Sequence, residues 1–223
     1  MQVEVKNITK TYTQGEETIS ALSNVELLLK KGDFVAITGR SGSGKSTLLN
    51  IIAGLTAPTS GVVLFDDKNF SAFSDAEASL FRNSKIGCVP QVPSLLSGLN
   101  ILDNVRLPFH LCKREGDSAK KAYHLLSMVG LEKLANRMPK RLSGGQVKRV
   151  AIARAMINKP ELMLLDEPTG DLDSDTTGDM MKIFKEAAQE GTIILMVTHD
   201  THIVNYANKH FTMGNLSSQN KGM

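Results

Sequence analysis

Short apolar segments of four or five residues recur along the chain, each followed closely by glycine or polar residues. This pattern is typical of buried strands in a sheet. The segments are Phe34–Ile37, Val62–Phe65, Ile86–Val89, Leu162–Leu165 and Ile193–Val197. The first thirty residues differ, because Val3 and Val5, and later Val25, Leu27 and Leu29, alternate with polar residues. Alternation predicts strands with one buried face, so we expect an antiparallel β layer there.

Helical spacing replaces the strand pattern in the middle of the chain. Ala122, Leu125 and Val129 lie on one face of an expected helix, and Gly130 follows as a stop. A further helix is expected from Gln146 to Ile157, and strand-like segments return after it. The polar tail from Ser217 to Met223 is expected to be frayed. We predict a single domain over 1–223, with a mainly parallel core and its antiparallel β layer at 1–91 and 159–215 and an inserted helical subdomain at 92–158.

A glycine-rich loop separates the first buried strand from an expected helix. It has the spacing G-x-x-x-x-G-K-[ST], and strand, loop and helix is the context that this phosphate-loop motif requires. Glycines let backbone N–H groups wrap around an anion, and the helix N-terminus adds further donors. We therefore predict an α/β fold of the P-loop NTPase type. The expected nucleotide-binding residues are Gly39, Arg40, Ser41, Gly42, Ser43, Gly44, Lys45, Ser46 and Thr47.

Four side chains near this loop are expected to carry the chemistry. Lys45 supplies positive charge for the β- and γ-phosphates, and the Ser46 hydroxyl is placed to ligate Mg²⁺. Asp166 and Glu167 follow an apolar strand, and parallel α/β sheets bind their ligands at the carboxyl ends of strands. We therefore expect Asp166 to hold Mg²⁺, through water, and Glu167 to polarise the attacking water.

A second anion-binding segment precedes the expected helix at residues 146–157. Ser143, Gly144, Gly145 and Gln146 offer a hydroxyl, flexible backbone N–H groups and a helix N-terminus. One nucleotide does not need two separate phosphate-binding segments. A second segment is useful if it closes on the nucleotide of another copy, which predicts a head-to-tail dimer with two shared sites.

Composition excludes several classes of protein. The 223 residues are 41% apolar and 22% charged, as in ordinary globular proteins, and the net charge of +3 is too small to indicate nucleic acid. No apolar run approaches the ~18 residues of a membrane span, and the first residues do not resemble a signal peptide. We therefore expect a chain kept in the cytosol. We also expect a solvated helix face near the nucleotide, made by Arg137, Lys140, Arg141, Lys148 and Arg149.

Together the motifs resemble those of the ATP-binding-cassette (ABC) ATPase family, over nearly the whole chain. The resemblance implies that Tyr12 stacks on adenine, that Gln91 senses Mg²⁺ and water, and that His199 contacts the γ-phosphate. Gln91, with Ser46 and Asp166, then holds the metal. The motifs occur in the family's order, namely Gly39–Thr47, Gln91, Leu142–Gln146, Leu162–Glu167, Leu172-Asp173 and His199.

The resemblance also implies a function. It implies a subunit that dimerises on ATP and hydrolyses it with Mg²⁺. A separate permease is expected to hold this subunit at the cytoplasmic face of the cell membrane. Leu48–Leu55 and Val150–Ala155 are similar to lipoprotein-releasing, macrolide-exporting and antimicrobial-peptide-resistance ATPases, so export or mechanical remodelling is favoured. Asp171 departs from that group, in which asparagine is usual. The transported substrate stays open, and a homodimer is expected.

Two alternatives share the cassette. DNA-repair and chromosome-organising ATPases carry long coiled coils, but this chain has no sustained heptads. Soluble translation factors carry tandem cassettes, whereas this sequence contains one. No nucleic-acid partner is therefore expected. Two interpretations are kept for Val92, Leu95, Leu96 and Leu99, which either line a groove for a permease helix or pack in the core.

Overall fold

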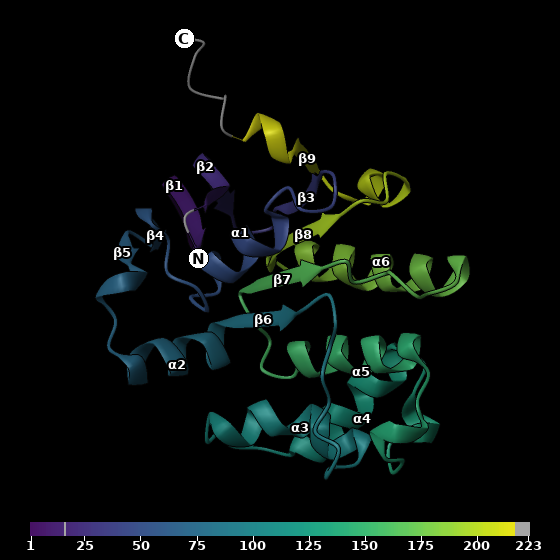
Figure 1. The fold of residues 1–223 in the computed structure, drawn as a ribbon. Coiled ribbons are helices and arrows are strands. Elements are labelled where there is room, and N and C mark those ends of the chain that lie inside the picture. The colour runs from purple at the N-terminus through teal and green to yellow at the C-terminus, as the bar shows by residue number, and fades with distance from the viewer. Residues whose placement is uncertain (16, 217–223) are drawn as a thin grey trace.

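The protein contains two β-sheets and six α-helices in the residues that its structure, a computed structural model, describes, namely 1–15 and 17–216 (Figure 1). The expected frayed tail at 217–223 lies outside the described residues. One sheet is antiparallel and the other parallel, which confirms the predicted α/β fold with an antiparallel layer. The helices are α1 (Lys45–Ile52), α2 (Asp75–Lys85), α3 (Ile101–Leu111), α4 (Ser118–Met128), α5 (Gly144–Met156) and α6 (Ser174–Gln189).

The antiparallel sheet has the strand order β2-β1-β4-β5. Its third strand is the apolar segment near residue 62, which pairs with β1 so that Val63 lies opposite Val5 and Phe65 opposite Val3. These four side chains are buried on the same face, which explains why the segment joins this sheet. The strands are β1 (Gln2–Gln14), β2 (Glu17–Lys30), β4 (Ser60–Phe65) and β5 (Lys68–Asn69).

The parallel sheet has the order β6-β7-β8-β3-β9 and is covered on both faces. Successive side chains of a strand point to opposite faces, so each strand contributes to two hydrophobic clusters. Phe34 packs with α3 to α6, whereas Val35 packs with α1 and the antiparallel sheet. The strands are β3 (Phe34–Thr38), β6 (Ile86–Val89), β7 (Leu162–Asp166), β8 (Ile193–Thr198) and β9 (Lys209–Thr212).

The helical region packs directly on this sheet. Val105 of α3, Leu126 of α4 and Ile152 of α5 share one buried cluster with Leu165 and Met196 of the sheet. The helices of residues 92–158 therefore have no core separate from the sheet, and the subdomain boundaries stay a prediction. No described helix has the length and apolar character needed to cross a membrane.

Candidate active site

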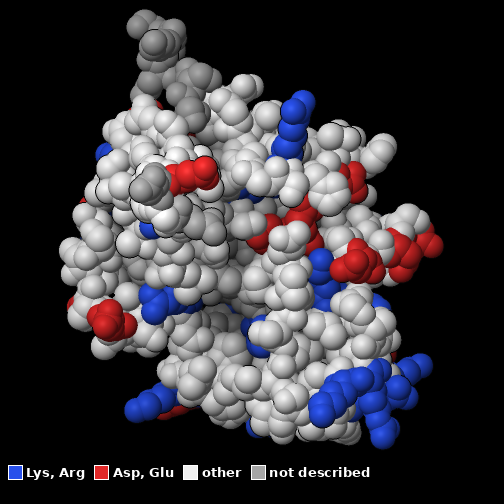
Figure 2. Space-filling model, in the orientation of Figure 1, with Lys and Arg blue, Asp and Glu red and all other residues white. Residues whose placement is uncertain are grey.

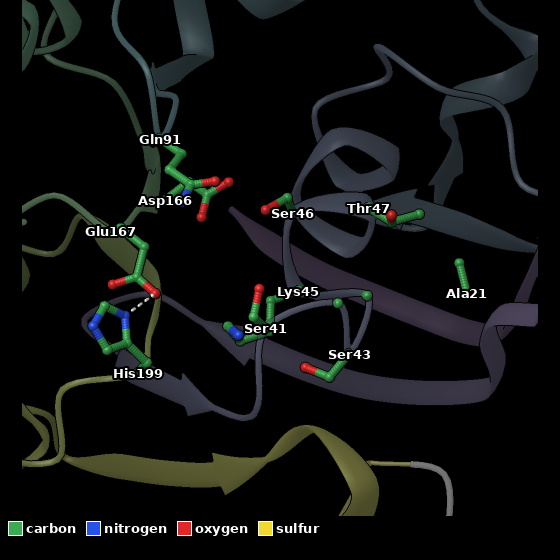
Figure 3. A pocket seen from close by; sticks show the side chains of 12 residues that line it. Ala21, Ser41, Ser43, Lys45, Ser46, Thr47, Gln91, Asp166, Glu167 and His199 are labelled. Carbon is green, nitrogen blue, oxygen red and sulfur yellow. Dashed lines mark hydrogen bonds and ion pairs between the residues drawn. The ribbon is translucent and has the colours of Figure 1, made fainter.

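A cavity of about 440 Å³ opens where three parallel strands end (Figure 3). The phosphate loop follows β3, Asp166 ends β7, and His199 follows β8. Because these strands are neighbours in the sheet, their carboxyl ends bring the three segments together, as the sequence predicted. The lining residues are Ala21, Ser41, Gly42, Ser43, Gly44, Lys45, Ser46, Thr47, Gln91, Asp166, Glu167 and His199.

The phosphate loop requires glycine for two different reasons. Gly44 has φ +90°, and a Cβ atom there would lie 2.2 Å from the Ala21 carbonyl oxygen. Gly39 does not adopt positive φ, but its Cβ would lie 2.8 Å from Ser43 Oγ and 3.1 Å from Met213 Cβ. Gly44 is also the N-cap of α1 and provides no side-chain cap, so the first N–H groups of the helix are left for a ligand.

Two side chains of this loop fit an anion. The Lys45 ammonium donates to the carbonyl oxygens of Gly39 at 2.8 Å and Arg40 at 3.0 Å, which holds it across the loop. Its third N–H remains for a phosphate. Ser43 Oγ is buried and has no hydrogen-bond partner among the described residues. Buried polar groups usually have a partner, so this hydroxyl indicates that a ligand completes the loop.

Oxygen donors from three segments meet beside α1. Figure 3 shows the side chains of Gln91 and Asp166 pointing toward Ser46. Hydroxyl, amide and carboxylate oxygens suit Mg²⁺, which takes few protein ligands and completes its shell with water and phosphate. No group of three His, Cys, Asp or Glu residues in the described part of the chain forms a metal cage. The oxygen donors of Ser46, Gln91 and Asp166 fit Mg²⁺ bound together with a nucleotide.

The electrostatics of Asp166 agree with such a site. Burial raises the pKa of its carboxyl above the ordinary value, and the adjacent Glu167 carboxylate adds to the rise. The Ser46 hydroxyl and the ammonium groups of Lys45 and Lys148 act in the opposite direction on this pKa. A bound divalent cation favours the ionised carboxylate, so proton and metal compete for Asp166.

Glu167 is held by contacts on both its backbone and its side chain. Its backbone has φ +48°, in the left-handed region that few non-glycine residues adopt. Its N–H donates to the Val197 carbonyl oxygen at 3.0 Å, and Thr198 Oγ1 donates to its carboxylate at 3.1 Å. These contacts direct the carboxylate into the cavity, where Figure 3 shows it beside His199.

His199 is largely solvent-exposed and contacts Glu167. The distance from His199 Nδ1 to Glu167 Oε1 is 2.8 Å, while 75% of the histidine side chain is exposed. The resemblance to ABC ATPases implied that His199 contacts the γ-phosphate, and its position at the cavity is compatible with that role, which stays a prediction. In this structure the imidazole orients the carboxylate.

Several predicted residues do not line the cavity. Gly39 and Arg40 contribute their carbonyl oxygens to Lys45 instead, and Tyr12 lies on β1, 45% exposed, with Lys10 Nζ 5.0 Å from its ring centroid. Ser143–Gln146 also lie outside it, at the start of α5. The Ser143 hydroxyl accepts from the Gln146 N–H at 3.3 Å, and Gln146 Oε1 accepts from the Ser143 N–H at 3.0 Å. This capping box fixes the N-terminus of α5.

The expected solvated basic face is correct only in part. Arg137, Lys140 and Arg141 are exposed, and Figure 2 shows Lys and Arg side chains gathered on the helical region. Lys148 is buried, so the prediction is wrong for this residue. Arg149 is half-buried and donates to the Val129 carbonyl oxygen at 2.9 Å. The turn of α5 that bears both residues faces other parts of the chain.

Two further residues of the site, Ala21 and Thr198, were not predicted from the sequence. Ala21 forms part of the cavity wall because β2 passes beside the phosphate loop, and Thr198 holds the Glu167 carboxylate. Ala21 carries no chemical signal in the sequence. Thr198 directly precedes His199 at the end of a buried strand, so its position was the available signal.

Comparisons with known proteins give matches over most of the chain. A model of the ABC transporter family matches residues 22–170. The uncharacterized ABC transporter ATP-binding protein MJ0796 of Methanocaldococcus jannaschii is 45% identical over 93% of this chain and 91% of its own length. The lipoprotein-releasing system ATP-binding protein LolD of Buchnera aphidicola is 42% identical, over 89% of this chain and 88% of its own length.

Two further comparisons concern a longer relative and a solved structure. The macrolide export ATP-binding/permease protein MacB of Chlorobaculum tepidum is 43% identical over 95% of this chain, which spans only 32% of that relative. The dimeric structure of MJ0796 in a post-hydrolysis state, bound to ADP and Pi, matches with a TM-score of 0.90 and 43% identity, over 94% of this chain and 93% of that one. The chain therefore belongs to the ABC transporter family, as an ATPase cassette homologous to the ATP-binding subunits of transporters, and a cassette acting on DNA or ribosomes is not favoured.

Proposed function

We propose that two copies of this chain close on ATP, hydrolyse it and drive a separate membrane permease. The observation that carries this proposal is the separation of the two anion-binding segments. Ser143–Gln146 do not line the cavity formed by the phosphate loop of the same chain. A nucleotide in that cavity would be exposed on one side. Residues Ser143–Gln146 of a second copy, the Ser143 segment, would cover that side. The dimeric arrangement of the related MJ0796 supports a homodimer.

The cavity residues suit hydrolysis of ATP to ADP and phosphate. The γ-phosphoryl group passes from the ADP oxygen to a water oxygen, and the water loses a proton to the Glu167 carboxylate. Lys45 and the N–H groups of the phosphate loop stabilise charge on the phosphates. Ser46, Gln91 and Asp166 would hold Mg²⁺, which would neutralise part of that charge. Thr198 and His199 keep the accepting carboxylate in place.

A groove beside the cavity is the proposed permease site. It has a volume of about 300 Å³ and shares Ser46, Gln91 and Asp166 with the nucleotide cavity as walls. Val92 and Leu55 line it and are 84% and 63% exposed. A short amphipathic permease helix in this groove would contact Gln91 and so sense the nucleotide site. The chain would then lie at the cytoplasmic face of the cell membrane.

The four apolar residues after Gln91 divide between the two interpretations. Val92 lines the groove, and Leu96 is 50% exposed, as expected of a docking surface. Leu95 instead packs against the buried cluster of α3 to α6. Leu99 is half-buried. We therefore assign Val92 to the groove and Leu95 to the core.

Co-purification tests the partner. Tagged chain recovered from detergent-solubilised membranes of its source organism should carry a multi-span membrane protein, identified by mass spectrometry, whereas ribosomes or DNA in its place would contradict the proposal. Val92→Asp should lower recovery of that protein on the order of tenfold, because it places a charge in an apolar contact. Leu28→Asp on β2, which replaces a side chain that is 43% exposed and outside the groove, is the control and should leave recovery unchanged.

Adenine stacking on Tyr12 gives a second expected result. Tyr12→Ala should raise the Kd for ATP roughly tenfold, since stacking of a base on an aromatic ring is worth ~1–3 kcal/mol. Tyr12→Phe should keep the wild-type Kd. The control is Ile19→Ala, because Ile19 lies opposite Tyr12 on β2 and is 53% exposed. Titration with a fluorescent ATP analogue measures these constants, and equal Kd values for Tyr12→Ala and wild type would exclude stacking.

The named activities of the relatives favour export or mechanical remodelling over import. MacB is a macrolide export protein, and LolD belongs to a lipoprotein-releasing system. For this chain we propose only the step that such systems need, in which closure of two cassettes on ATP moves the permease. Selection of the transported substrate is assigned to the permease.

A further inference from the structure

Lys148 is a buried cation between the Ser143 segment and Glu167. It lies on α5, the helix that Ser143 caps, and only 3% of the residue is exposed. Its ammonium donates to the backbone carbonyl oxygen of Glu167 at 2.9 Å and lies 3.8 Å from the Asp171 carboxylate. Lysine is almost never fully buried unless it is paired. The position of this side chain is therefore defined by the segment that follows β7.

The backbone of Glu167 depends on such contacts. Its φ of +48° is unfavourable for a residue with a side chain and persists only where the surroundings impose it. The sheet anchors the N–H of Glu167 on Val197, but its carbonyl oxygen lies beyond the end of β7. That oxygen accepts from Lys148 at 2.9 Å and from the Gly170 N–H at a longer 3.3 Å. Lys148 makes the shorter of the two contacts.

The first turn of α5 also packs tightly on the segment after Glu167. A Cβ atom on Gly145 would lie 2.9 Å from the Asp171 carbonyl oxygen and 3.0 Å from Leu172 Cδ2. A Cβ atom on Gly170 would lie 3.2 Å from Lys148 Nζ. There is little free space between α5 and residues 170–172, so a displacement of α5 must be transmitted to this segment.

We propose that Lys148 is a positioning residue that couples the Ser143 segment to the Glu167 carboxylate of the same chain. This inference rests on the proposed function, in which Ser143 contacts the nucleotide bound by the partner and Glu167 acts on the nucleotide bound by its own chain. When α5 closes on the ATP bound by the partner, Lys148 and residues 170–172 fix the backbone of Glu167. Glu167 then acts on the ATP bound by its own chain. Each chain thus links the two sites of the dimer through Lys148 and the segment packed against α5.

Kinetics of three variants test this coupling. Lys148→Met keeps the length and apolar stem but has no donor, and we expect kcat to fall on the order of tenfold at an unchanged KM for ATP. Lys148→Gln retains an N–H donor and should recover most of kcat. The matched control is Lys182→Met, which removes the lysine of an exposed pair with Asp179 on α6 and should leave both constants unchanged. A wild-type kcat for Lys148→Met, or an equal loss for Lys148→Gln, would overturn the proposal.

Hydrogen exchange gives a readout independent of turnover. Without nucleotide, Lys148→Met should speed amide exchange in peptides covering residues 167–172 and leave peptides of the phosphate loop unchanged. Unchanged exchange at 167–172 would overturn the proposal even if activity fell. If the wild-type chain itself did not hydrolyse ATP, the proposed function would fail, while the exchange comparison would still decide whether Lys148 positions Glu167.

Discussion

Glu167→Gln is expected to reduce ATP turnover by at least about a hundredfold while leaving ATP affinity unchanged. The substitution keeps the size of the side chain and its contact with Thr198 but removes the negative charge that accepts the proton of water. Nucleotide binding relies on Lys45 and the loop amides, which it does not touch. Because hydrolysis opens the dimer in this mechanism, the variant should form a stable dimer with ATP.

Phosphate release at saturating ATP and size-exclusion chromatography with and without ATP measure these effects. The control is Glu161→Gln, which removes a carboxylate directly before β7, at the end of the strand opposite to the cavity. Glu161 pairs with Lys85 and with the N-terminal ammonium, far from the nucleotide. Turnover should be unchanged in this control. Wild-type turnover in Glu167→Gln would show that another group accepts the proton.

Ser143→Arg is expected to abolish turnover, by about a hundredfold or more, without loss of ATP binding to the monomer. Ser143 is exposed and outside the cavity of its own chain, so the larger side chain does not obstruct that cavity. In the dimer, the substitution removes the hydroxyl that would contact the partner's nucleotide. The arginine side chain would also fill the space that the phosphates of this nucleotide need. ATP should therefore bind without closing the dimer.

Loss of the helix cap must be separated from loss of the shared site. Ser143 and Gln146 form a capping box, and removing the serine costs ~1 kcal/mol of stability. Ser74 and Glu77 form the same box on α2, outside the cavity. Ser74→Arg therefore lowers stability similarly and should keep normal turnover. If Ser143→Arg turned over normally as a homodimer, the shared-site model would be wrong.

The two variants can be combined. In the Glu167→Gln background, ATP should produce a stable dimer, whereas the double variant with Ser143→Arg should remain monomeric at the same ATP concentration. Light scattering coupled to size-exclusion chromatography distinguishes the two states. A dimer of the double variant would show that Ser143 does not contribute to closure.

Local features of the site followed from the sequence. The motif spacing, in its context of strand and helix, predicted the loop at Gly39–Thr47, and the apolar segments around it predicted the buried strands and the edge of the sheet where Asp166 and Glu167 lie. The end of a helix near Gly130 was predicted as well, and α4 ends at Met128, two residues before this glycine. These features depend on short sequence separations and on side-chain type, which a single chain displays directly.

The tertiary structure decided the features that depend on distant parts of the chain. Strand β9 forms because Phe211 and its neighbours pair with β3, more than 170 residues earlier, and the short polar segment carries no strong strand pattern. Lys148 looked like part of a solvated basic face. Its burial depends on the Glu167 carbonyl oxygen, and the left-handed backbone that presents this oxygen is not encoded in any local pattern.

The sequence by itself therefore determined which chemical groups this ATPase cassette possesses and where each lies relative to its own strand or helix. The order of the parallel strands and the packing of α5 against the segment after β7 decided which of those groups touch. The physical reason is that burial and hydrogen bonding of a side chain depend on every element around it, and those elements come together only in the folded chain.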